Sequence, residues 1–71
     1  MGGDAITQIN PLAEGYRSLE TDAAGAARWA RQALGAHPGS APALRLLGLA
    51  LRASGQAEEA AQYEQRSLKA P

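Results

Sequence analysis

The sequence predicts an all-α protein of four helices, arranged as two tandem helix-turn-helix hairpins that form a short α-solenoid. Three observations support this prediction. Apolar residues recur with helical spacing in four segments, and three of these segments follow a residue that caps helices well. The second half of the chain also matches the first half at a constant offset, whereas no segment has the alternating pattern of a strand.

The first predicted helix covers residues 11–20. Asn10 is a good N-cap, and Pro11 suits the first helical position, where its missing N–H has no intrahelical partner to lose. The apolar residues of this helix fall on one face: Leu12, Tyr16 and Leu19. We expect the preceding residues 1–9, which contain a Gly-Gly pair, to form a flexible segment.

The second predicted helix covers residues 23–36. Thr21 or Asp22 caps it, and the Asp22 carboxylate also suits the positive end of the helix. Pro38 ends the segment because proline cannot continue a helix. Its stripe consists of small residues and one tryptophan: Ala26, Trp29, Ala30 and Ala33.

The third predicted helix covers residues 41–54 and follows the capping residue Ser40. Its leucines occupy more than one stripe, because Leu46 and Leu49 widen the apolar face. That face is formed by Leu44, Leu47, Gly48 and Leu51. So broad an apolar arc predicts a helix with neighbours on two sides, and Gly48 predicts that one of them approaches closely.

Gly55 supplies the residue of positive φ that commonly ends a helix, so it marks the turn of the second hairpin. The fourth predicted helix covers residues 57–69. Glu58 and Glu59 favour its N-terminus and Lys69 its C-terminus. Its stripe holds Ala60, Tyr63 and Ser67, with Leu68 beside them.

The chain matches itself when it is shifted by 34 residues. Leu12 then falls on Leu46, Trp29 on Tyr63, and Leu34 on Leu68. A helix-turn-helix unit with this period is the signature of the tetratricopeptide repeat, and the chain resembles that family. The resemblance divides residues 10–71 into two repeats, about 10–39 and 40–71. It is carried by Leu47-Gly48, Gly55 and Ala60 in the second repeat and by Ala26, Ala33 and Pro38 in the first.

The first repeat departs from the pattern of the family. Ala13-Glu14 stands where a Leu-Gly pair is expected, and Thr21 replaces the turn glycine. We therefore expect the first helix to pack with an altered register.

The resemblance also implies a binding surface. In tetratricopeptide proteins the first helix of each repeat lines a concave groove that binds peptides. The register assigns partner binding to Arg45, Leu46, Leu49, Arg52, Leu12 and Leu19. Leu46 and Leu49, if exposed together, form an apolar patch between two arginines, and such patches mark contacts. The alternative for the arginines is solvation, or pairing with Glu14 or Glu20. Leu49 stands where chaperone-binding members carry asparagine, so an acidic C-terminal peptide is not the expected ligand.

Composition argues against several classes of function. Seven basic residues balance seven acidic ones, which gives no general attraction for nucleic acid or for an anionic membrane. No cysteine is present and His37 is the only histidine, which argues against a zinc cluster. His37 lies in a turn before Pro38, and the dipole of the fourth helix explains Glu58 and Glu59, so we expect no metal site, no cofactor and no catalytic residues. The chain lacks a long apolar run and a secretion signal at its start, which predicts a cytoplasmic protein. The Arg- and Ala-rich composition suggests a bacterial source.

The resemblance implies a protein–protein interaction module rather than an enzyme. Its partner would be a protein or peptide, or a second copy of the chain, bound through an apolar groove or an open end. Two repeats are fewer than the roughly three that usually bury a continuous core, so we expect an apolar face that another polypeptide covers. The alternatives are a homodimer and the N-terminal assembly or docking domain of a larger bacterial enzyme, such as a sulfotransferase or an oxygenase-like hydroxylase.

Overall fold

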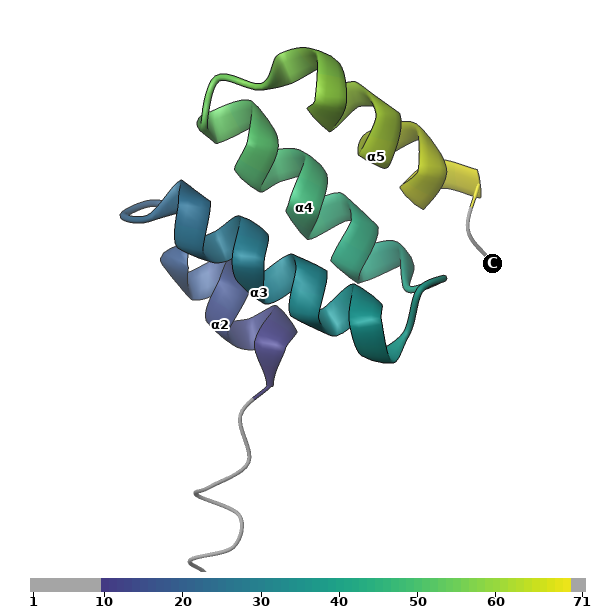
Figure 1. The fold of residues 1–71 in the computed structure, drawn as a ribbon, viewed down its shortest axis with the longest axis horizontal. Coiled ribbons are helices and arrows are strands. Elements are labelled where there is room, and N and C mark those ends of the chain that lie inside the picture. The colour runs from purple at the N-terminus through teal and green to yellow at the C-terminus, as the bar shows by residue number, and fades with distance from the viewer. Residues whose placement is uncertain (1–9, 70–71) are drawn as a thin grey trace, which may run out of the picture.

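The computed structural model describes residues 10–69, which form four helices and no strand (Figure 1). The helices are α2 (Pro11–Ser18), α3 (Ala23–Ala36), α4 (Ala41–Ala53) and α5 (Ala57–Lys69). The predicted all-α fold is confirmed. The bounds of the second and fourth helices agree with the prediction, while the first helix ends two residues earlier than predicted and the third ends one earlier. The predicted flexible segment 1–9 lies outside the described residues.

The helices pack as two hairpins side by side. Short connections make α2 pack against α3 and α4 pack against α5. α4 lies between α3 and α5, and it also contacts α2 (Figure 1). Within residues 10–69, α5 contacts no helix other than α4. The broad apolar arc predicted for the third helix therefore has the neighbours on two sides that it requires.

Each predicted N-cap accepts a hydrogen bond from the first turn of its helix. The side chain of Asn10 accepts from the N–H of Leu12, and Asp22 accepts from the N–H of Gly25 at 3.0 Å. The Ser40 hydroxyl does the same for Ala43 at 3.2 Å. These bonds satisfy donors that a helix leaves unpaired at its start, which explains why the helices begin where the sequence predicts.

The early end of α2 is explained by the turn that follows it. The N–H groups of Thr21 and Asp22 both donate to the carbonyl of Ser18, at 3.1 and 2.7 Å. Asp22 then adopts a non-helical backbone, as an N-cap residue must. Because Asp22 caps α3, the residues just before it form a turn instead of prolonging α2.

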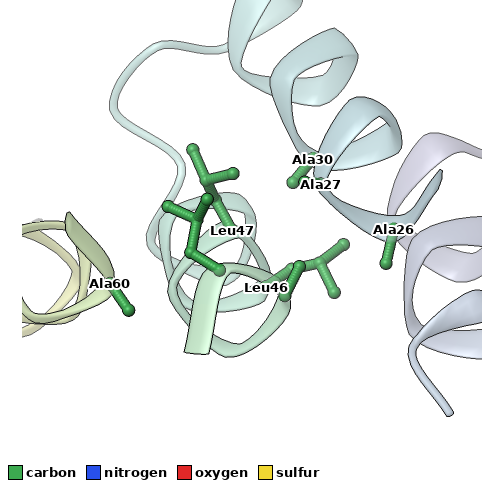
Figure 2. Close-up of a cluster of buried hydrophobic side chains, with 8 residues drawn as sticks. Ala26, Ala27, Ala30, Leu46, Leu47 and Ala60 are labelled. Atoms are coloured by element: carbon green, nitrogen blue, oxygen red, sulfur yellow. The ribbon is translucent and has the colours of Figure 1, made fainter. Parts of the chain in front are cut away.

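The core is built from leucines of one helix and alanines of its neighbours. All four buried leucines of residues 10–69 lie on α4: Leu44, Leu46, Leu47 and Leu51. The buried alanines of the neighbouring helices are Ala26, Ala27, Ala30 and Ala33 on α3 and Ala60 on α5. Figure 2 shows Ala60 approaching α4 from the side opposite to Ala26. Alanine lets helix backbones approach closely, and the leucines fill the space between them.

Two glycines mark the closest approaches between helices. A side chain at Gly15 on α2 would collide with the Leu46 side chain, and its Cβ would lie 3.2 Å from the Cβ of Trp29. A Cβ at Gly48 on α4 would lie 2.7 Å from the Cγ of Glu64 and 3.3 Å from the Ala60 carbonyl oxygen of α5. The sequence predicted the role of Gly48, and Gly15 plays the same role for α2.

The core leucines of α4 do not form the apolar face that we expected another polypeptide to cover. Leu47 and Leu51 are 1% and 2% exposed, so they need no further polypeptide to cover them. α5 shields α4 and turns a polar face outward, which consists of Glu58, Glu59, Gln62, Gln65, Arg66 and Lys69. The expectation of an uncovered core is therefore wrong, because the fourth helix itself provides a polar outer surface.

Candidate partner-binding groove

Three of the six predicted partner-binding residues lie together on one side of α4. Arg45, Leu49 and Arg52 are spaced at i, i+4 and i+7, and this side of α4 lies next to α5. Arg45 and Leu49 line a common hollow with residues of α5, and Arg52 bonds to a side chain from that helix.

The other three predicted residues belong to the interior. Leu46 is fully buried, so the expectation that Leu46 and Leu49 are exposed together is wrong for Leu46. The reason is the position of α2, whose Gly15 brings its backbone against the Leu46 side chain. Leu12 and Leu19 are half-buried and pack against the same core. These three leucines contribute to packing within the fold instead of forming an exposed patch.

Two adjoining open hollows, of about 300 and 240 Å³, form a groove over α4 and α5. Both are lined by Arg45, Ser67 and Leu68. The first extends past Ala41 and Pro42 to Tyr16 of α2, and the second extends to Leu49 and Glu64. We call these residues together the α4–α5 groove.

The groove gathers the exposed large hydrophobic side chains of the described chain. Tyr16 and Leu68 are the only large hydrophobic residues of the range 10–69 that are exposed, at 41% and 85%, and both line the groove. The Tyr16 hydroxyl lies 3.5 Å from the carbonyl oxygen of Pro42, so the ring extends toward the start of α4. A single exposed apolar side chain is ordinary, but two that flank one hollow form a surface suited to contact.

A bidentate ion pair closes one end of the groove. The Arg52 guanidinium donates to both carboxylate oxygens of Glu64, at 3.0 and 2.7 Å. Gly48 makes this pair possible, because the stem of Glu64 lies where a side chain at position 48 would be. The hydrogen bond from Arg52 holds the pKa of Glu64 below its ordinary value, although partial desolvation acts in the opposite direction. The same hydrogen bond raises the pKa of Arg52.

Arg45 differs from Arg52 in its surroundings. Arg45 is exposed, and it forms no ion pair with any residue of the range 10–69. The two ion pairs of that range are Arg52 with Glu64 and Arg17 with Glu14, the latter at 3.6 Å. Of the charged residues within 10–69 that line the groove, Arg45 is thus the one that forms no ion pair with another residue of that range.

Sequence reasoning missed six residues of the groove: Tyr16, Ala41, Pro42, Glu64, Ser67 and Leu68. Tyr16 shares a predicted face with Leu12 and Leu19, and the sequence does not indicate that its ring extends beyond that face to Pro42. The usable signals were Leu68, a large apolar residue on an otherwise polar helix, and Gly48, whose missing side chain leaves room for Glu64.

The described residues show no arrangement that suggests a metal centre. Residues 10–69 contain no group of three or more His, Asp or Glu side chains placed to hold a metal ion. His37 is exposed in the connection between α3 and α4. In the same range, no helix combines the length and the apolar character that crossing a membrane requires.

Comparison with family models, with curated proteins and with solved structures gave no match to this chain.

Proposed function

We propose that this chain is a protein-interaction module of tetratricopeptide type, which binds a segment of a partner polypeptide in the α4–α5 groove. The observation that carries the proposal is the convergence of Tyr16, Leu68 and Arg45 on one open surface. Apolar side chains supply buried area on binding, and an arginine beside them supplies orientation.

Support also comes from the way in which the scaffold holds this surface. Arg45 and Leu49 belong to α4, which carries four other leucines that are buried, so the helix cannot rotate without exposing its core. The Arg52–Glu64 pair ties α5 to α4 beside the groove. A binding surface on rigid helices loses less conformational entropy on association than a surface on loops.

Selection from a displayed library of random peptides tests this proposal. Peptides selected on the wild-type chain should bind at least about tenfold more weakly to Leu49→Glu, because that change places a charge on the apolar floor of the groove. The control is Gln32→Glu, which adds the same charge on the exposed face of α3, away from the groove. Circular dichroism should show the same helix content in all three proteins.

The selection also yields a result that overturns the proposal. If the selected peptides bind wild type, Leu49→Glu and Gln32→Glu equally, the groove does not recognise polypeptides. The same conclusion follows if the library yields no binding peptide.

A further inference from the structure

We infer that the segment bound in the α4–α5 groove carries a side-chain carboxylate next to a large apolar residue. This inference rests on the proposed function, and it adds the chemistry of the partner. It comes from the charges that line the groove and from the position of Arg45 among apolar side chains.

The charge balance of the groove is positive because one acid is already occupied. The two charged residues that line it are Arg45 and Glu64. Glu64 is bound at both carboxylate oxygens by Arg52, which satisfies it within the chain. Arg45 has no such partner among residues 10–69. A ligand therefore meets an unpaired guanidinium and a neutralised carboxylate, which favours an acidic ligand over a basic one.

The apolar part of the ligand is indicated by the side chains next to Arg45. Leu68, the most exposed large hydrophobic residue of the described chain, lines both hollows together with Arg45. Leu49 lies one helical turn from Arg45 along α4. An apolar side chain that packs on Leu68 and Leu49 brings a neighbouring carboxylate within reach of the guanidinium. Burial of the apolar group also lowers the local dielectric, which strengthens the ion pair.

Two other occupants fit the charges less well. A nucleic acid or a free phosphate usually binds several cations, whereas Arg45 is the only cation of residues 10–69 that lines the groove. A second copy of the chain that used the same surface would bring its own Arg45 to the interface, and like charges oppose such an association.

Parallel selections on wild type and on Arg45→Glu test the inference, with a random library in which every peptide ends in a C-terminal amide. The amide leaves only side-chain carboxylates to be selected. Wild type should select peptides with Asp or Glu beside a large apolar residue, and Arg45→Glu should select Lys or Arg in that place. Arg31→Glu, a matched reversal on the exposed face of α3, should select the same peptides as wild type.

Affinities of individual peptides complete the test. An acidic peptide selected on wild type should bind Arg45→Glu about three- to tenfold more weakly, and its Glu→Lys version should recover that loss. The inference is overturned if wild type and Arg45→Glu select the same peptides, or if light scattering shows a wild-type dimer that Leu49→Glu converts to a monomer. Peptides that depend on Leu49 but not on Arg45 would leave the proposed function standing and overturn only the acidic preference.

Discussion

Gly48 permits α5 to lie against α4 because it has no side chain. A Cβ at this position would lie 2.7 Å from the Cγ of Glu64 and 3.3 Å from the carbonyl oxygen of Ala60. The first of these atoms is in the middle of a side chain that Arg52 holds in place, and the second belongs to the backbone. Neither atom moves without disturbing the contact between the two helices.

We therefore expect Gly48→Ala to destabilise the protein, although alanine is the better helix former. The gain in helix propensity is up to about 1 kcal/mol, and overpacking a helix contact costs about 1–3 kcal/mol, so the net loss should be about 1 kcal/mol. Urea unfolding measures this change in the free energy of unfolding.

Gly35→Ala is the matched control, because a Cβ at position 35 meets nothing within 4 Å. Gly35→Ala should stabilise the protein by about 0.5 kcal/mol. Equal effects of the two changes would contradict the close contact at Gly48.

At the scale of elements, the helices and their caps could be predicted from the sequence because their signals are local. Asn10, Asp22 and Ser40 each act within their own first turn, and the φ of +84° at Gly55 is a property of one residue. How each helix is rotated toward its neighbours could not be predicted in the same way. That rotation decides that Leu46 is buried and that Arg45 is exposed, and it depends on the close approach of α2 at Gly15.

The groove was partly predictable, because some of its residues are local to one helix. Residues of one helix face, Arg45, Leu49 and Arg52, could be grouped by spacing alone. The partner of Arg52 could not be found by spacing, because Glu64 belongs to another helix and reaches Arg52 only across Gly48. Spacing pointed to Glu14 and Glu20 as possible partners of the two arginines, but Glu14 pairs with Arg17 instead.

The contact between α4 and α5 should respond to pH through Glu64. Its pKa is lower in the folded state than the ordinary value of 4.5, chiefly because Arg52 donates hydrogen bonds to its carboxylate. Between the unfolded pKa and the lower folded pKa of Glu64, the folded state therefore binds fewer protons than the unfolded state. The stabilisation is therefore fully present above the unfolded pKa and is lost as the pH falls through the folded pKa.

The prediction for this pair is a pH-dependent difference between wild type and Arg52→Gln. The melting temperature of wild type should exceed that of the variant at neutral pH, and the difference should shrink as Glu64 becomes protonated. NMR titration of the Glu64 side-chain carboxyl carbon should give a higher pKa in Arg52→Gln. Arg31→Gln removes an exposed charge from α3 and is the control, with a Glu64 titration like that of wild type. An unchanged Glu64 titration in Arg52→Gln would show that the pair does not persist in solution.

At the scale of the whole molecule, α4 is the element that joins the two hairpins. It contacts each of the other three described helices, and it carries every buried leucine of residues 10–69. Helix α3 of the first hairpin contributes Ala26, Ala27 and Ala30 to the core around these leucines, and α5 contributes Ala60. The core therefore draws on side chains from both hairpins. Because both depend on the same leucines, we expect the described part of the chain to unfold as one cooperative unit.

Leu47→Ala tests this cooperativity. Leu47 is 1% exposed within the shared core, so truncating it should lower the free energy of unfolding by about 2–5 kcal/mol. The fluorescence of Trp29, the single tryptophan, reports on α3, whereas far-ultraviolet circular dichroism reports on all the helices. In a urea titration both signals should shift together to a lower midpoint.

Leu68→Ala is the control, because a side chain that is 85% exposed contributes little to stability. The unfolding midpoint of this variant should stay near that of wild type. If the Trp29 transition in Leu47→Ala keeps the wild-type midpoint while part of the helical signal is lost earlier, the hairpins unfold independently, and α4 does not join them as the packing of its leucines implies.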